Sequence, residues 1–204
     1  KSTFLSILMG IHKRDGGTIL HRGNPVEFAN PAEALRSGIA IIEQELSPVP
    51  HMTVAENIYL GREPSARFGG IDFKTMNRNA QALLDRLEFS ILATQYMMNL
   101  SVARQQLVEI AKALSHEADV IFMDEPTSAI GEKEAQHLFS AIKRLKAEGK
   151  GIVYVSHRLS EIFQIADAYT VFRDGSYIDS GNLADIDRPS LIRMIVGREL
   201  AEEY

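Results

Sequence analysis

Apolar and polar residues follow two patterns along this chain. Short runs of consecutive apolar residues, typical of strands buried on both faces, occupy 39–42, 120–123 and 152–155. Longer stretches place an apolar residue every third or fourth position, as amphipathic helices do, most clearly over 72–89 and 131–148. Strands that alternate with helices predict an α/β protein with a mostly parallel, helix-covered sheet.

Capping, glycine and proline residues predict further, shorter elements and a helical subdomain. Thr53 followed by Glu56 predicts a capping box, and Gly10 predicts the end of the first helix. Glycine and proline over 61–70 mark a boundary, and the residues from about 62 to 116 are expected to form a helical subdomain within one domain over 1–204. The remaining elements expected are strands over 18–20 and 26–28 joined across 22–25, a helix over 31–37, a hairpin around 173–175, and a last helix after Pro189.

The run 120–123 leads directly into Asp124, Glu125 and Pro126. Because proline cannot continue a strand ladder, the strand must stop at the acids. Ligands of open α/β sheets bind at the carboxyl ends of the strands. Two adjacent carboxylates there suit a metal-nucleotide site, in which one holds the shell of a cation and the other orients water. An ordinary acidic turn is the alternative.

The other two apolar runs also end in polar residues. Strand 39–42 leads to Gln44, whose carbonyl oxygen could ligate a cation and contact water. Strand 152–155 delivers Ser156 and His157 to the same edge of the sheet. Taken alone, an exposed loop amide and a solvated histidine would explain them, but their position beside the two carboxylates makes both candidates for a site.

Two helix starts suit phosphate binding. Lys1-Ser2-Thr3 matches the end of the phosphate-binding pattern G-x-x-x-x-G-K-[ST], although the glycines of that pattern are not in this chain. Ser101 begins a second helix, where free N–H groups and the positive end of the helix dipole favour an anion. Simple capping by serine or threonine is the alternative in both places.

Composition excludes several classes of protein. The 204 residues are 45% hydrophobic and 24% charged, which allows a globular core. A net charge of −5 gives no support for nucleic-acid binding. The chain has no cysteine, which excludes disulfides and thiolate metal sites and is compatible with a reducing compartment. It begins with Lys1 rather than methionine, so we expect a piece of a longer protein.

The ordered set of these motifs resembles the ATP-binding cassette family of P-loop ATPases. Each motif is weak by itself, whereas their order along the whole chain is highly specific. The matching segments are Lys1-Ser2-Thr3 (end of Walker A), Gln44 (Q-loop), 100–105 (signature motif), 120–125 (Walker B with its catalytic glutamate) and His157 (switch histidine).

Further segments resemble the first cassette of bacterial monosaccharide importers of the ribose, galactose and xylose type. These segments are 44–46, 52–62, 108–114, 125–129 and 196–200. Such importers carry two cassettes in one polypeptide, so the resemblance implies that the second cassette, the start of Walker A and the strands before it lie outside this chain. Without them two strands would be unpaired in the middle of the sheet, and the isolated chain is expected to fold poorly and bind little ATP.

The resemblance also implies ATP hydrolysis with Mg²⁺ at a site shared by two cassettes. Lys1 would neutralise the β- and γ-phosphates, Ser2 would ligate Mg²⁺ and Thr3 would contact the α-phosphate. Gln44 would complete the metal shell, and Asp124 would hold the water shell of the metal. Glu125 would polarise the attacking water, and His157 would grip the γ-phosphate. The nucleotide of the opposing cassette would contact Leu100, Ser101, Val102, Ala103 and Gln105.

The implied partners are membrane permease subunits, a second cassette in the same polypeptide or a dimer, and indirectly a periplasmic sugar-binding protein, with no nucleic acid. The protein would lie peripherally on the cytoplasmic face of the bacterial inner membrane. A coupling helix of the permease would dock near residues 44–52 and the helical subdomain.

Departures from the family pattern leave two alternatives. Ala103 stands where the signature motif usually has glycine, and Arg104 is not the residue most often found next to that position. Gly131 stands in the loop after Walker B, where aspartate or threonine is usual. A catalytically weak regulatory or structural cassette is therefore a second hypothesis, although Glu125 and His157 are intact. A DNA-repair-type ATPase is disfavoured because the span from Gln44 to Ser101 is too short for the long coiled coil that those proteins carry.

Overall fold

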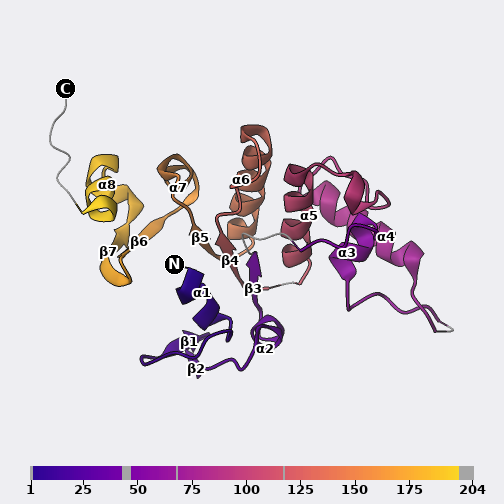
Figure 1. Cartoon of the computed structure of the whole chain (residues 1–204), viewed down its shortest axis with the longest axis horizontal. Helices are drawn as coiled ribbons and strands as arrows, with labels where there is room; N and C mark the ends of the chain where they lie inside the picture. The colour runs from indigo at the N-terminus through magenta and orange to yellow at the C-terminus, as the bar shows by residue number, and fades with distance from the viewer. Residues whose placement is uncertain (1, 43–46, 68, 117, 198–204) are drawn as a thin grey trace.

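The structure, a computed structural model, describes residues 2–42, 47–67, 69–116 and 118–197. Within them the central sheet consists of parallel strands in the order β3-β4-β5 (Figure 1). These strands are Ile39–Ile42 (β3), Val120–Asp124 (β4) and Gly151–Val155 (β5). Ile39 lies opposite Val120, and Val120 lies opposite Gly151, so the three strands end at a common edge. The expected α/β class with a parallel sheet is confirmed.

Helices and two antiparallel hairpins surround this sheet. The hairpins are Ile19–His21 (β1) with Asn24–Val26 (β2), and Ala168–Arg173 (β6) with Ser176–Asn182 (β7). The helices are Ser2–Leu8 (α1), Pro31–Arg36 (α2), Val54–Tyr59 (α3), Phe73–Arg86 (α4), Val102–Leu114 (α5), Glu132–Ala147 (α6), Leu159–Ile165 (α7) and Arg188–Val196 (α8), with 3-10 turns at Met97–Asn99 (η1) and Leu183–Asp185 (η2). Of the helices in the described ranges, none is long and apolar enough to cross a bilayer.

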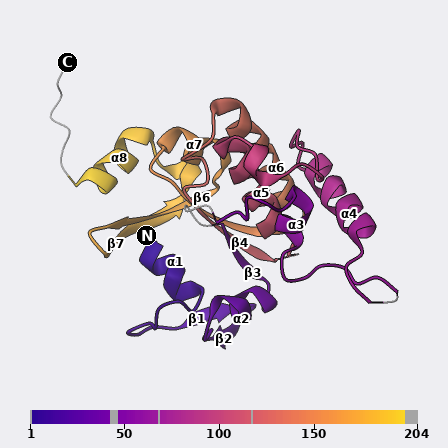
Figure 2. The same cartoon turned by 45° about the vertical axis from the view of Figure 1, so that its right-hand side comes forward.

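The two faces of the sheet pack against different helices because neighbouring side chains of a strand point to opposite sides. Ile121 and Met123 of β4 belong to the large core shared with α3, α4, α5 and α6. Phe122, between them, packs with Leu5 and Met9 from α1 and its C-terminal end. Figure 2 shows the two groups of helices on either side of the sheet. Helix α1 is thereby fixed against the strand that carries the acids.

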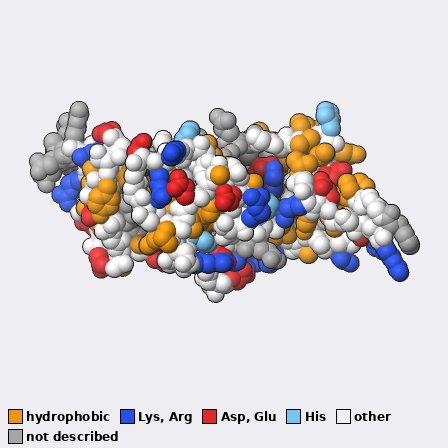
Figure 3. Space-filling view, turned by 90° about the horizontal axis from the view of Figure 1, so that it is seen from below, with side chains coloured by type: hydrophobic (Ala, Val, Ile, Leu, Met, Phe, Trp, Pro, Cys, Tyr) orange, Lys and Arg blue, Asp and Glu red, His pale blue; other side chains and the backbone are white. Residues whose placement is uncertain are grey.

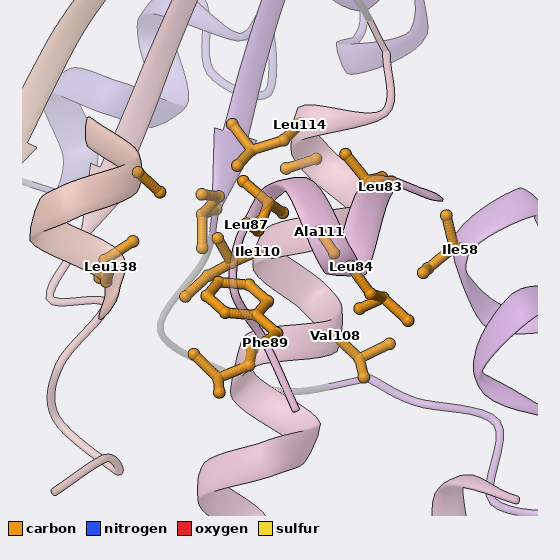
Figure 4. Packing of buried hydrophobic residues seen from close by; sticks show 14 of the residues in the cluster. Ile58, Leu83, Leu84, Leu87, Phe89, Val108, Ile110, Ala111, Leu114 and Leu138 are labelled. Carbon is orange, nitrogen blue, oxygen red and sulfur yellow. The ribbon is translucent and has the colours of Figure 1, made fainter. Parts of the chain in front are cut away.

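Side chains of α3, α4, α5 and α6 pack together in the large core (Figure 4). Leu84 of α4 and Val108 and Ile110 of α5 are fully buried there, together with Ile58 of α3. Burying each of these side chains contributes about 1.5–3 kcal/mol. The apolar stripe over 72–89 is therefore core, as the helical spacing predicts.

The capping box at the start of α3 is confirmed. The backbone N–H of Thr53 donates to Glu56 Oε2 at 2.7 Å, and the backbone N–H of Glu56 donates to Thr53 Oγ1 at 3.3 Å. Asp72 and Ser101 cap α4 and α5 with their side-chain oxygens. Local residue chemistry thus sets the starts of these helices.

Three expectations were wrong or incomplete. The strand expected over 26–28 lies at Asn24–Val26, because Arg22 and Gly23 both have positive φ and form a two-residue turn. β5 was expected to be buried on both faces, but Val153 is 38% exposed, because β5 is the outer strand of the described sheet and is covered less than β4. Helix α7, Leu159–Ile165, was not predicted.

Candidate functional site

The candidate site lies where β4 and β5 end beside each other. Asp124 is the last residue of β4, lies opposite Val155, and is 8% exposed. The backbone N–H of Glu125 donates to the carbonyl oxygen of Val155 at 2.9 Å, which extends the ladder one residue past the strand. Both predicted carboxylates therefore sit at the carboxyl edge of the parallel sheet.

Glu125 has an unusual backbone. Its φ of +46° lies in the left-handed region, which for a residue other than glycine costs on the order of 1–3 kcal/mol. Strained residues of this kind concentrate at functional sites, where a required side-chain direction outweighs the strain. Arg22, Glu88 and Asp174 also have positive φ, so Glu125 is distinguished by its position at the end of β4 and not by the angle alone.

The side chain of Glu125 reaches the predicted histidine. Glu125 Oε1 lies 3.1 Å from His157 Nδ1, within hydrogen-bonding distance. The Glu125 side chain is 26% exposed and the His157 side chain is 64% exposed, so solvent and ligands can reach both. Two candidates from different strand ends thus meet in one accessible pair.

A buried carboxylate that was not predicted from the sequence binds the two loops that carry this pair. Glu161, in the first turn of α7, is 6% exposed and accepts hydrogen bonds from Thr127, Tyr154 and Ser156. Burial raises the pKa of Tyr154 well above its ordinary range, so this phenol keeps the proton that it donates. The available sequence signal was that Glu161 shares a helical face with Ile165, which is also buried.

Helix α1 presents two of the predicted phosphate-binding residues. Ser2 and Thr3 lie exposed in its first turn, and in Figures 1 and 2 this end of the helix points toward the carboxyl ends of the strands. Lys1 and Gln44, the other candidates near the phosphates and the metal, lie outside the described residues.

The predicted signature residues divide into two groups. Ser101 is exposed at the start of α5, where its Oγ accepts from the backbone N–H of Arg104 at 3.4 Å, and Val102 is also exposed. The other three side chains serve the fold, so a ligand would meet them through the backbone. Leu100 is buried, Ala103 packs against the core, and Gln105 Nε2 donates to the carbonyl oxygens of Met97 at 3.1 Å and Leu100 at 3.2 Å.

The donors present fit magnesium rather than a softer metal. Among the described residues, no three histidine or acidic side chains are grouped closely enough to hold a metal ion by themselves. Asp124 and Ser2 offer a carboxylate and a hydroxyl, which are hard oxygen donors. Magnesium is ordinarily bound by one or two such groups together with substrate phosphates and water.

Comparison with known proteins identifies the family of the chain. The ABC transporter family matches residues 1–128. The chain belongs to the ABC transporter family. Over all 204 residues it is 52% identical to a putative ribose/galactose/methyl galactoside import ATP-binding protein of Pseudomonas fluorescens, and 48% identical to one of Burkholderia cenocepacia. The chain spans 40% and 39% of the length of these relatives.

Solved structures confirm the ATP-binding cassette fold, which is a P-loop ATPase fold. An ATP-binding cassette of an ABC transporter in its ADP conformation superposes with a TM-score of 0.79 and 26% identity, covering 97% of this chain and 84% of that one. A dimeric cassette in a post-hydrolysis state bound to ADP and Pi gives a TM-score of 0.74 at 23% identity, covering 89% of this chain and 80% of that one.

Proposed function

We propose that this chain is part of an ATPase that energises sugar import through a membrane permease. The observation that carries the proposal is the pairing of Glu125 with His157 at the carboxyl edge of the sheet, next to Asp124. The names of the relatives support the sugar-import assignment, since those proteins are described as ribose/galactose/methyl galactoside import ATP-binding proteins.

In the proposed reaction each residue acts mainly by position and charge, as in phosphoryl transfer generally. Bound Mg²⁺ would supply neutralising charge for the phosphates, and Ser2, Gln44 and Asp124 would hold it. Glu125 polarises the attacking water through its carboxylate. His157, held by Glu125 at 3.1 Å, grips the γ-phosphate with its other ring nitrogen.

The remaining phosphate contacts come from helix starts. Lys1 neutralises the β- and γ-phosphates, and Thr3 contacts the α-phosphate. Ser101 belongs to another part of the surface, because α5 lies on the far side of β3 from α1 (Figure 1). This arrangement supports a site completed by a second cassette, in which Ser101 serves the nucleotide of the partner.

We also infer that residues 62–116 form a helical subdomain that meets the permease. They are inserted between β3 and β4, and α4 and α5 both pack against α3. Leu92, Tyr96 and Met98 are more than half exposed in this insertion. The backbone N–H of Met98 donates to the carbonyl oxygen of Pro50 at 3.0 Å, which joins the apolar residues to the loop expected to receive a coupling helix.

This proposal places the protein peripherally on the cytoplasmic face of the inner membrane, with a periplasmic sugar-binding protein as an indirect partner. A role on nucleic acid has little support. The net charge is −5, and the face in Figure 3 intersperses acidic and basic side chains instead of presenting a basic stripe.

Mg-ATP turnover of the full-length protein with its permease tests the proposal. Glu125→Gln keeps the shape of the side chain but removes the charge that polarises water, so turnover should fall on the order of 100-fold or more. Glu148→Gln, at an exposed position at the end of α6, is the matched control and should turn over ATP normally. Undiminished turnover by Glu125→Gln would overturn the catalytic assignment of this cassette and favour a regulatory or structural one.

A further inference from the structure

Glu161 accepts hydrogen bonds from the two loops that carry Glu125 and His157. Thr127 Oγ1, in the loop after β4, donates to Glu161 Oε1 at 2.8 Å and lies 2.9 Å from Oε2. Ser156 Oγ, directly after β5, donates to Oε2 at 2.9 Å. One carboxylate therefore joins chain segments that are far apart in the sequence.

Two further donors complete the surroundings of this carboxylate. Tyr154 OH, from β5 itself, donates to Oε2 at 2.9 Å, and Arg158 Nη1 lies 3.4 Å from Oε1. An ionised carboxylate only accepts hydrogen bonds and offers about four acceptor positions, which these donors fill. A buried charge is tolerated when it is paired and hydrogen-bonded in this way, and the same bonds fix the direction of every donor.

The positions of the donors along the chain connect Glu161 to the reactive pair. Thr127 is two residues beyond Glu125, and Ser156 and Arg158 flank His157 on both sides. Ser156 Oγ also accepts from the backbone N–H of Arg158 at 2.9 Å, which closes a tight turn around His157. The loop of Glu125 and the loop of His157 are thus tied to a common buried group on α7.

We propose that Glu161 is a positioning residue that holds Glu125 and His157 at the separation needed for hydrolysis. This inference rests on the proposed ATPase function. Glu161 is 6% exposed, and its hydrogen bonds go to the loops that carry the reactive pair, so it acts through Thr127 and Ser156. Charge-assisted hydrogen bonds are stronger and shorter than neutral ones, which suits a group that must fix two loops at once.

Steady-state ATP turnover of the full-length protein with its permease tests this role. Glu161→Gln preserves shape but replaces one acceptor oxygen by an amide donor that faces the hydroxyls. We expect kcat to fall about 10-fold or more, because small displacements of reacting groups reduce rates strongly. KM for ATP should stay within about twofold, because the phosphate and metal contacts proposed for the start of α1 are not altered by this substitution. The exposed Glu148→Gln variant should behave as wild type.

A second variant separates positioning from folding. Thr127→Val removes one donor to Glu161 while keeping the shape of the side chain. It should lower kcat by a smaller factor, while its circular dichroism spectrum shows that the variant is still folded. Combined with Glu161→Gln it should add no further loss, because both variants break the same connection. If Glu161→Gln does not fold, Thr127→Val and Tyr154→Phe, each expected to lower kcat at unchanged KM, carry the test.

The outcomes distinguish the two proposals. If Glu125→Gln retains turnover, the proposed function of the site fails. If Glu125→Gln is inactive while Glu161→Gln, or both donor variants in its place, keeps the wild-type kcat, the positioning role is overturned. It is also overturned if the variants raise KM and leave kcat unchanged, or if the losses of the double variant are additive.

Discussion

Replacing Gly10 by alanine tests how α1 is anchored. Gly10 has φ +71° just beyond the end of α1, and a Cβ there would lie 2.3 Å from the carbonyl oxygen of Phe28 and 2.8 Å from its carbon. Both contacts are with backbone atoms, so no side chain can rotate away to make room. The substitution must move either the end of α1 or the segment that leads into α2.

The magnitude follows from comparison with Gly149, which has φ +83° but no described atom within 4 Å of the position that an alanine methyl group would take. Both alanine variants should lose about 1–2 kcal/mol for the left-handed backbone. Gly10→Ala should lose about 1–3 kcal/mol more, because added atoms in a packed region force displacement. Urea unfolding followed by circular dichroism measures both. Equal losses of unfolding free energy in the two variants would refute the role assigned to the Phe28 contact.

Two further predictions concern the core and the pH dependence of stability. Leu84→Ala, at a fully buried position, should reduce the unfolding free energy by about 2–5 kcal/mol, whereas Leu20→Ala, at a 62% exposed position, should change it by less than about 0.5 kcal/mol. Burial, together with the charges of Arg62 and Lys112, lowers the pKa of His116 from 6.5 to about 4. As the pH drops, His116 therefore takes up a proton in the unfolded state before it does so in the folded state. The free energy of unfolding should fall by about 1 kcal/mol between pH 6.5 and pH 4, a value that allows for solvent screening. His116→Asn should flatten this dependence on pH.

Local sequence chemistry accounts for much of the fold. The runs at 39–42 and 120–123 became strands because consecutive apolar side chains can fill both faces of a covered sheet. The turn was predicted to span residues 22–25 because Asn24 and Pro25 are also good turn residues. In the structure both belong to β2, and an edge strand tolerates proline. The exposure of Val153 depends on which elements cover β5, and no property of residues 151–155 specifies that.

The candidate site was predictable to the extent that it depends on strand ends. Asp124, Glu125 and His157 follow apolar runs directly, and parallel strands bring such positions to one edge. Glu161 was not predictable in the same way, because its partners come from residues 127, 154, 156 and 158 and only the folded chain brings them around it. A buried acid inside an apolar helix pattern was the remaining local indication.

The separate roles proposed for the two adjacent acids depend on one backbone angle. In a regular strand, Asp124 and Glu125 would point to opposite faces of the sheet. The positive φ of Glu125 breaks this alternation while its N–H still bonds to Val155, so the side chain turns toward His157 before Pro126 ends the ladder. Glycine would adopt that angle without strain but would carry no carboxylate. Because the Glu125 side chain meets His157 in this conformation, the proposed role requires the carboxylate at this position and not only the turn.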